Sequence, residues 1–551
     1  MIPSFIYEAK KLRTLQIYGG HIPSVSSDLF RHLTCLRTLN LGGTYLEELP
    51  NEIEKLVHLR YLNLDKARFK ELPKTVTSLY NLRVLSLYRC INLCKLPEGI
   101  WRLVNLIVLD LKECRQLSYL PEGIGKLCKL RILSYFTIGG GVEQRGGCKI
   151  GELKDLNFLQ YTLKIIGLGR VENGNEAKLA CLNNKQHLRA LYIYFNQFTG
   201  VSLVDEGVDE EDKIEEEVVD GGDMSSRKRM EDVLESLRPH PNLEKLSIVD
   251  YPGVVFPNWM GSHAEPMIFS NLVFLELRGW RKCKQLPPTL GKLPSLETLV
   301  IDGMDKVKFM GVEFFGIDDD GGATRRSSDT IIFPKLKVFL LGVMQNLEEW
   351  NMRVQDKEEK DGNNKEFIFM PCLQHLVLAV LPKLRSFPQH LTRGATFLRK
   401  LFIWNCPKLN WMMPSSPSST SHDLPYLHVE ELILKWDAGS FSKSLLLEVP
   451  NNNHMWWLFL PKLKLLRVRQ SPYSSLPQGL GKLTSLEILD IRTCSKIKSI
   501  PEGELQHLTA LQELRVMRCP ALRPRCRKEI GEDWSKISHI PNIFIDREKI
   551  K

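Results

Sequence analysis

Seven side chains in the C-terminal part of the chain have the clearest chemistry for binding another molecule. Aromatic and arginine side chains are the types that dominate the binding energy of protein–protein interfaces. They lie in or next to short segments in which apolar and polar residues alternate, the pattern of a strand with one open face. We predict a protein-binding surface made of Phe402, Trp404, Arg467, Arg469, Arg492, Arg515 and Arg518.

The arginines of this set come from three consecutive segments, which begin at Leu463, Leu486 and Leu511. Adjacent strands of a sheet lie about 4.8 Å apart. We therefore expect the arginines to form one basic column on the open face of the sheet, where they would suit an acidic or polar protein surface. A solvated face with incidental charges is the alternative.

Motifs of catalysis and of cofactor binding do not occur in the sequence. There is no G-x-x-x-x-G-K-[ST] loop to hold phosphates, no H-E-x-x-H pair of zinc ligands and no G-x-S-x-G nucleophile turn. Single histidines such as His58, His375 and His507 are expected to be exposed or packed side chains. We predict that the chain is not an enzyme and that it has no catalytic residue, no metal-binding residue and no cofactor.

A repeat positions these segments. Four of its copies, LRTLNL, LRYLNL, LRVLSL and LIVLDL, begin at Leu36, Leu59, Leu82 and Leu106, in steps of 23, 23 and 24 residues. A period of roughly 20 to 29 residues centred on L-x-x-L-x-L is typical of a leucine-rich repeat. One repeat cannot bury its own apolar face, so each copy stacks on the next. The predicted fold class is α/β: a leucine-rich-repeat solenoid of about 17 repeats, a curved horseshoe with a parallel β-sheet on its concave face.

Within each repeat the spacing of apolar residues predicts a strand followed by a short helical turn. Leu36, Leu39 and Leu41 are expected to be buried, because they alternate with polar residues. After the Leu-Pro phrase that closes the repeat, Ile53 and Leu56 have the i, i+3 spacing of a helical turn. The proline is predicted at the first helical position, where its missing N–H is no loss.

Cysteine occupies the position, three residues after the last strand leucine, where such repeats usually carry asparagine. A buried thiol is a small apolar filler with a weak donor, so we interpret these cysteines as structural. The chain has 13 cysteines, an odd number, and no doubled C-x-x-C arrangement, which argues against a disulfide framework and a zinc site. The repeat cysteines are Cys90, Cys114, Cys406, Cys494 and Cys519.

The regularity of the repeat divides the chain into five parts. They are residues 1–133 with regular N-terminal repeats, 134–198 with irregular repeats, 199–230 as an acidic disordered insertion, 231–522 with irregular C-terminal repeats and loop insertions, and 523–551 as a C-terminal cap and tail. The insertion is predicted to be disordered because it has eleven acids and one lysine between Asp205 and Asp223. The first repeat lacks a polar cap, so we expect a truncated product or a partner that covers it.

Composition and motifs predict an intracellular, cytoplasmic protein. The sequence is 43% hydrophobic and 25% charged, and it has no apolar run of the roughly 18 residues that a membrane span needs. It lacks a signal peptide and an N-x-S/T glycosylation site. The formal net charge of +10 raises the possibility of nucleic-acid binding, but no basic stripe is interleaved with aromatic residues, so we predict no nucleic-acid partner.

Two copies of the repeat have the variant L-x-[IV]-x-x-C-P-x-L, at LFIWNCPKL (401–409) and LRVMRCPAL (514–522), and the second continues into the tail RPRCRKEIGEDWSKISHIPNIFID. These segments resemble the C-terminal region of plant disease-resistance proteins of the coiled-coil, nucleotide-binding, leucine-rich-repeat class. The LPEGI phrasing of the first repeats and the segment GGCKIGELKDLNFLQYTLKIIGL (146–168) carry the same resemblance. It covers nearly the whole chain.

The resemblance implies the sensing region of an intracellular immune receptor. Such a region recognises a pathogen effector or a guarded host protein, and it folds back on the nucleotide-binding module. ADP and ATP would belong to that module, whose motifs are absent from this sequence. The first block of repeats, Leu36–Leu133, is expected to contact it.

A general intracellular leucine-rich-repeat scaffold or adaptor is the alternative function, because such proteins use the same repeat of 23 residues without a switch. A substrate receptor of a ubiquitin ligase is less well supported, since no F-box-like helical segment precedes the repeats.

Overall fold

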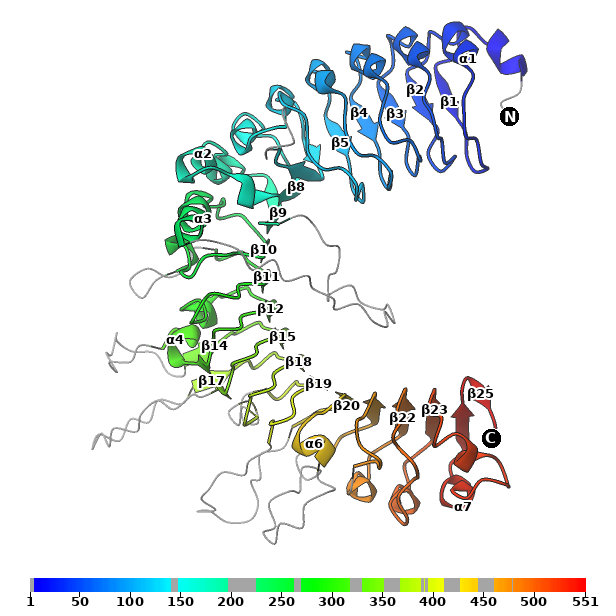
Figure 1. The fold of residues 1–551 in the computed structure, drawn as a ribbon, viewed down its shortest axis with the longest axis vertical. Helices are drawn as coiled ribbons and strands as arrows, with labels where there is room; N and C mark the ends of the chain where they lie inside the picture. The colour runs from blue at the N-terminus through cyan, green and yellow to red at the C-terminus, as the bar shows by residue number, and fades with distance from the viewer. Residues whose placement is uncertain are drawn as a thin grey trace. The chain divides into compact units, whose positions relative to one another are not determined.

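The computed structural model describes residues 4–139, 147–196, 224–261, 269–317, 330–350, 367–387, 391, 395–410, 427–443, 460–477 and 479–551. They belong to two compact units, Met1–Trp259 and Met260–Lys551. Each unit is a row of short strands joined by connections that carry short helical turns (Figure 1). Nearly all neighbouring strands are parallel, which confirms the leucine-rich-repeat solenoid predicted from the sequence.

The first unit opens with six strands that pair in sequence order, each parallel to the next. Their central leucines share one register row, and Leu39, Leu62 and Leu85 are completely buried. The polar neighbours Thr38 and Asn40 remain half-buried on the open face, as the alternation predicts. The strands are β1 (Thr14–Gln16), β2 (Thr38–Asn40), β3 (Tyr61–Asn63), β4 (Val84–Ser86), β5 (Val108–Asp110) and β6 (Ile132–Leu133).

The predicted turns after each Leu-Pro phrase are short helices, most of them 3-10 helices. Ile53 and Leu56 are both fully buried, as their spacing predicts. The position of the proline differs from the prediction: Pro50 is the N-cap, with an extended conformation (φ −62°, ψ 146°), one residue before the helix. The helices after Leu-Pro phrases are η2 (Asn51–Lys55), η3 (Lys74–Ser78), η4 (Glu98–Arg102) and η5 (Ile124–Lys126), and η1 (Ser4–Glu8) and α1 (Ser27–His32) precede them.

The rest of the first unit continues with longer, less regular repeats, in which the four strands pair in parallel and in sequence order. The elements are β7 (Tyr135–Thr137), η6 (Ile150–Leu153), β8 (Tyr161–Ile166), η7 (Leu168–Arg170), α2 (Gly174–Lys178), η8 (Leu182–Asn184), β9 (Leu188–Tyr194), α3 (Met224–Ser236) and β10 (Lys245–Val249), and η9 (Asn258–Met260) follows.

Helix α3 corrects one sequence prediction. The acidic disordered insertion was assigned to residues 199–230, but residues 224–230 form the first half of this helix. Met230, Val233 and Leu234 are buried along one side of α3, with the i, i+3, i+4 spacing of an amphipathic helix. The sequence analysis did not predict this helix, because the charge of Arg227, Lys228 and Arg229 favoured disorder. Residues 199–223 lie outside the described part of the chain.

In the second unit, ten strands form a single row with the same parallel pairing. They are β11 (Phe274–Arg278), β12 (Thr298–Asp302), β15 (Val338–Gly342), β18 (His375–Ala379), β19 (Lys400–Trp404), β20 (Glu431–Lys435), β21 (Leu465–Arg469), β22 (Ile488–Arg492), β23 (Glu513–Met517) and β24 (Asn542–Ile545). Strand β24 lies in residues 523–551, which the sequence analysis assigned to a C-terminal cap and tail.

Two short parallel pairs, which the sequence did not predict, join connections of the second unit: β13 (Phe309–Met310) with β16 (Glu349–Trp350), and β14 (Thr330–Ile332) with β17 (Phe367–Phe369). The helices of this unit are η10 (Leu290–Lys292), α4 (Val312–Phe315), α6 (Ser440–Lys443), η12 (Leu480–Lys482), η13 (Leu505–His507), η14 (Pro524–Cys526) and α7 (Trp534–Ile537). Predicted insertions at 318–329, 354–366 and 414–422, and most of the glycine-rich loop at 139–147, lie outside the described residues.

The C-terminal segment ends the row with β24 and the antiparallel strand β25 (Glu548–Lys549). Asp533, which is fully buried, joins this segment to the preceding repeat. Its carboxylate accepts hydrogen bonds from the Ile500 amide (3.0 Å) and from Arg525 Nε (3.1 Å), and it pairs with Lys536 Nζ (3.0 Å). Burial raises the pKa of Asp533, but the bonds from Arg525, the Ile500 amide and Lys536 outweigh it, so the net pKa is lowered.

We expect Asp533→Asn to loosen the C-terminal segment by about 2 kcal/mol, because hydrogen bonds to a buried charge are lost. Hydrogen exchange of residues 498–545 at neutral pH measures this opening. The lowered pKa means that the unfolded chain binds the proton first, so the stabilisation is complete above about pH 4 and is lost as the pH falls through the folded pKa. Equal exchange in both proteins at neutral pH would contradict the role of Asp533.

Candidate functional site

The structure places six of the seven predicted binding residues on strands of the second unit, at positions that alternate with the buried leucines. Phe402 and Trp404 lie on β19, where both are half-buried. The arginines Arg467 and Arg469 are on β21, Arg492 is on β22 and Arg515 is on β23. Arg518 is different, because it follows the end of β23 in a left-handed conformation with a φ of 53°.

The register of the parallel strands arranges these residues in two columns. The first column runs from Phe402 through Ile433 and Arg467 to Asp490 and Arg515. The second, one step further along each strand, consists of Trp404, Lys435, Arg469, Arg492 and Met517. Strand β20 therefore separates the two aromatic residues from the arginines.

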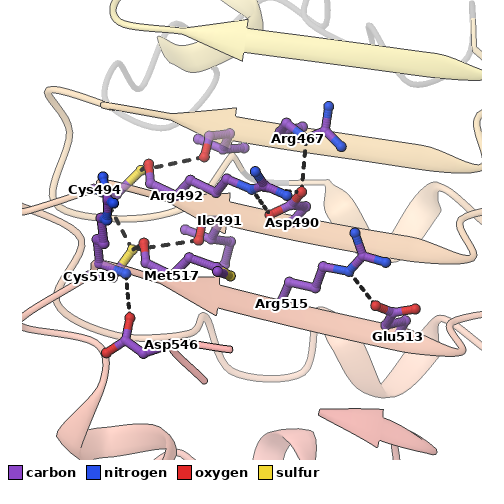
Figure 2. A network of polar contacts seen from close by, with 12 residues as sticks. Arg467, Asp490, Ile491, Arg492, Cys494, Glu513, Arg515, Met517, Cys519 and Asp546 are labelled. Carbon is purple, nitrogen blue, oxygen red and sulfur yellow. Dashed lines mark hydrogen bonds and ion pairs between the residues drawn. The ribbon is translucent and has the colours of Figure 1, made fainter. Parts of the chain in front are cut away.

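The predicted basic column forms only in part. The second column brings Arg469 and Arg492 together next to Lys435, but an acid lies inside the first column. Asp490 sits between Arg467 and Arg515 in the register, and its side chain is completely buried. Arg467 Nε donates to Asp490 Oδ2 (2.8 Å), and Arg492 Nε donates to Asp490 Oδ1 (2.9 Å) (Figure 2). The carboxylate therefore fixes two of the predicted binding residues.

Other acids pair with the remaining charges of these strands. Arg515 donates through Nε to Glu513 on its own strand (Figure 2). Arg467 Nη1 also lies 3.6 Å from Glu431 of β20. On the open positions of β20–β23, five cationic side chains face three acids, which leaves the surface positive by two charges: Lys435, Arg467, Arg469, Arg492 and Arg515 against Glu431, Asp490 and Glu513.

The aromatic end of the surface has its own polar contacts. Lys435 Nζ lies 4.4 Å from the ring centroid of Trp404, in a cation–π contact. Trp436, at the end of β20, donates from Nε1 to Gln470 Oε1 (3.0 Å), and 49% of its surface is exposed. A large exposed indole is the type of group that anchors a protein partner.

The cysteines predicted at the ends of the strands form a ladder of hydrogen bonds beside these columns. The Cys494 amide donates to Cys519 Sγ (3.4 Å), and the Ser471 amide donates to Cys494 Sγ (3.4 Å). Each thiol in turn donates to a carbonyl at the end of its own strand, Arg492 O (3.2 Å) or Met517 O (3.3 Å) (Figure 2). The thiol thus bonds the turn backbone, the role that asparagine has in other repeats.

The same position is buried throughout the ladder, which agrees with the structural interpretation. Cys90 Sγ donates to Leu64 O (3.2 Å) and Cys114 Sγ to Leu87 O (3.1 Å) in the first unit. Burial raises the pKa of Cys114 and of Cys406 to about 12, so these thiols stay protonated and able to donate.

Comparison with known proteins agrees with this repeat architecture. Residues 150–304 match the family described as "R13L1/DRL21 LRRs", and residues 10–69 match "Leucine rich repeat". The putative disease resistance protein RGA4 of Solanum bulbocastanum is 32% identical over 96% of this chain. Disease resistance protein RGA2 of the same species is 39% identical over 70% of the chain, and the putative disease resistance RPP13-like protein 1 of Arabidopsis thaliana is 29% identical over 69%. The chain belongs to the leucine-rich-repeat regions of plant disease-resistance proteins.

This disease-resistance repeat region spans only part of its relatives: 48% of RGA4, 36% of RGA2 and 29% of the RPP13-like protein. Among solved structures, a leucine-rich-repeat protein of Leptospira interrogans is 18% identical with a TM-score of 0.39, covering 99% of this chain and 92% of that one. The ectodomain of the Arabidopsis thaliana receptor kinase GASSHO1/SCHENGEN3 is 15% identical with a TM-score of 0.36, covering 94% of this chain and 60% of that one.

Three residues of the repeat region's surface were missed in the sequence: Asp490, Lys435 and Trp436. Asp490 is the polar residue of LEILDI, and Lys435 and Trp436 follow ELIL, so the alternation that identified the arginines also contains Asp490 and Lys435. A search for cations alone overlooks Asp490. In the part of the chain that the structure describes, no three His, Cys, Asp or Glu side chains cluster as metal ligands, and no helix is long and apolar enough to cross a membrane.

We expect Asp490→Asn to destabilise the second unit by about 3 kcal/mol, because Arg467 and Arg492 lose the buried charge that holds them. Urea unfolding of the full chain, followed by tryptophan fluorescence, measures the change. The matched control is Glu430→Gln, whose carboxylate lies 3.6 Å from Lys464 Nζ at an exposed position. Its cost should stay below about 0.5 kcal/mol. Equal effects of the two variants would contradict the network.

Native thiol titration should separate the buried cysteines of the ladder from the exposed Cys128. We expect Cys128, which is exposed, to react rapidly with a disulfide reagent at mildly alkaline pH. The ladder cysteines should react only after urea is added, because they are buried. Peptide mapping by mass spectrometry identifies the labelled residues, and rapid native labelling of Cys90, Cys406 or Cys494 would contradict the ladder.

Proposed function

We propose that this chain is the recognition and regulatory region of a plant intracellular immune receptor that acts in the cytoplasm. It binds a pathogen effector or a guarded host protein through the open face of the second unit, and it binds the nucleotide-binding module of the receptor through the first block of repeats. It performs no catalysis itself, and ADP or ATP binds only to that module. The similarity to RGA4 along 96% of the chain carries this proposal.

The surface around Trp404 and Trp436 supports recognition of a protein. It combines two indoles with a fixed set of guanidinium groups, and such aromatic and arginine anchors supply most of the energy of protein interfaces. Because Arg467 and Arg492 are held by Asp490, a partner does not have to order them on binding. The excess of two positive charges favours a partner with an acidic surface beside an apolar one.

The first block offers a different open face for the regulatory contact. Tyr61, Val84 and Val108 are half-buried side chains in one register row across β3–β5. A neighbouring row consists of the polar residues Asn63, Ser86 and Asp110. An apolar row beside a polar row is the composition of a reversible interface inside a multidomain receptor.

Co-precipitation with the nucleotide-binding fragment of a disease-resistance receptor of this class tests the proposal. We expect the full chain to bind the fragment, and Tyr61→Glu combined with Val108→Glu to reduce the bound fraction at least about fivefold, since charges then replace the apolar row. The control is Phe402→Ala combined with Trp404→Ala, which alters the second unit and should leave this contact unchanged.

Absence of binding by the unaltered chain would favour the alternative of a general leucine-rich-repeat scaffold. Equal loss of binding in both double variants would contradict the assignment of the regulatory contact to the first block alone. Thermal unfolding of each variant shows whether its fold is preserved.

A further inference from the structure

The second unit contains a pocket of about 190 Å³ that has no part in the proposed function. It lies near the end of the chain, between the segment around η14 and the hairpin of β24 and β25. Its lining combines three cations, two carboxylates and two isoleucines. Pockets that enclose a whole small molecule measure about 300 to 1,000 Å³, so this one has room for one terminal group of a larger ligand.

The three cations lie on one wall of this C-terminal pocket. They are Arg523, Arg527 and Lys528. Cys526, in the same segment, is completely buried and anchors the backbone beneath them. A second tie follows directly, because the Gly531 amide donates to Arg527 O (2.9 Å). The cationic side chains are therefore exposed, but the backbone that carries them is fixed.

The opposite wall is the hairpin, which turns at Asp546 and Arg547. Both residues have positive φ angles, 46° and 74°, as a two-residue type I′ turn requires. The turn is tied to the preceding repeat. The Asp546 amide donates to Val516 O (2.9 Å), and Asp546 Oδ1 accepts from the Arg518 amide (2.6 Å). Both walls of the C-terminal pocket are thus held by backbone contacts and do not need a ligand to form.

Only part of the charge in the pocket is compensated within the protein. Asp546 is already in use, because Oδ2 lies 3.2 Å from Arg523 Nε. Arg527, Lys528 and Glu548 are exposed, and none of them forms an ion pair or a side-chain hydrogen bond with another residue that the structure describes. Two cations and one carboxylate therefore remain for a ligand, and the pocket is positive by one charge.

The apolar part of the lining comes from the two strands of the hairpin and the residue after them. Ile545 is buried and Ile550 is half-buried. Ile550 is fixed by its own backbone, since its amide donates to Ile543 O (2.9 Å). A ligand for this space must therefore present an anionic group and an apolar group close together, with a hydrogen-bond donor for Glu548.

We propose that the C-terminal pocket binds the last residue of a peptide or protein partner, one with an apolar side chain. The α-carboxylate of that residue lies between Arg527 and Lys528, and its side chain lies against Ile545 and Ile550. Its backbone N–H donates to Glu548. This inference holds whichever protein supplies the terminus, so it does not depend on the proposed function.

A C-terminal residue fits because its three groups branch from one carbon atom. The α-carboxylate, the side chain and the N–H all lie within the space of a single residue, which matches the small volume of the pocket. An arginine guanidinium pairs with a carboxylate through two parallel hydrogen bonds. An internal aspartate or glutamate also offers a carboxylate, but it has no apolar side chain on the same carbon to cover Ile545 and Ile550.

A phosphate group fits the C-terminal pocket less well. A phosphorylated side chain carries a charge of about −1.5 to −2 at neutral pH. Glu548 lines the same space, and a like charge nearby disfavours such an anion. A single negative charge suits a pocket that is positive by one.

Fluorescence anisotropy of the full chain with labelled peptides tests the inference. The probe has about six residues, a label at its N-terminus, and leucine with a free carboxylate as its last residue. We expect it to bind at least about tenfold more tightly than the same peptide with an amidated C-terminus, which lacks the charge. A peptide that ends in glycine should bind at least about threefold more weakly than the leucine probe, because it lacks the apolar side chain.

Two variants with equal loss of charge locate the binding. Arg527→Gln combined with Lys528→Gln should weaken binding of the leucine probe at least about tenfold. The control is Arg547→Gln combined with Lys549→Gln, which alters the same hairpin outside the pocket and should change the affinity less than about twofold. All four side chains are exposed, so thermal unfolding should be nearly unchanged in both variants.

A third variant tests the apolar contact separately. Ile550→Ala should reduce the preference for leucine over glycine to less than about twofold, because part of the apolar wall is removed. The preference for the free carboxylate over the amide should remain, since Arg527 and Lys528 are intact.

Three results would overturn the inference: equal affinity for the carboxylate and amide probes, unchanged affinity when Arg527 and Lys528 are replaced, or tighter binding of an amidated phosphoserine peptide through the same two cations. The last result would assign the pocket to phosphorylated partners.

Discussion

Burial of each repeat's leucines against those of the next repeat is the constraint on which the rest of the structure depends. The strands of the first block have only two or three residues each, too few for backbone hydrogen bonds alone to hold a sheet together. A fully buried leucine contributes about 1.5 to 3 kcal/mol, and the row of Leu39, Leu62 and Leu85 continues through the block without an exposed member. Register follows from this row, since a slip by one residue would expose every leucine.

A fixed register converts positions in the repeat into columns on the open face. Residues about two dozen positions apart, such as Arg467 and Asp490, become neighbours because each occupies the same place in its repeat. The charge pattern of the surface therefore depends on which residues face one another on neighbouring strands, and less on their order within one strand. In the second unit the first column places Asp490 between Arg467 and Arg515, whereas the second column places Lys435, Arg469 and Arg492 next to one another.

The sequence was sufficient for the features that one repeat determines by itself. The alternating leucines, the helical turn at Ile53 and Leu56, and the buried cysteines all follow from spacing within about two dozen residues, and the structure confirms them. The binding residues Phe402 and Trp404 were placed on an open strand face for the same reason. Their role in binding stays a prediction.

The features that the sequence did not predict depend on what lies beside a residue in the next strand or helix. Asp490 was visible in LEILDI, but its burial results from Arg467 and Arg492, which close over it from two strands. The sequence analysis missed helix α3 because it judged disorder from charge. The charge of the three cations at the start of the helix concealed the helical spacing of Met230, Val233 and Leu234. In both cases a residue's structure depends on the side chains that pack against it in the folded protein, and composition alone does not identify those side chains.

The two open faces differ in the physical cost of using them. Arg467 and Arg492 are already ordered by a buried carboxylate, so a partner gains their hydrogen-bonding groups with little loss of side-chain entropy. Exposed arginines of the first unit, such as Arg37 and Arg60, must be ordered when a partner binds, and each loses up to about 2 kcal/mol of rotamer freedom. Their advantage is electrostatic: uncompensated charge attracts an acidic partner before contact and raises the association rate. A contact through such exposed charges is therefore expected to form faster and to depend more on salt than one through Arg467 and Arg492. The difference arises because Asp490 pairs with both Arg467 and Arg492 in the second unit.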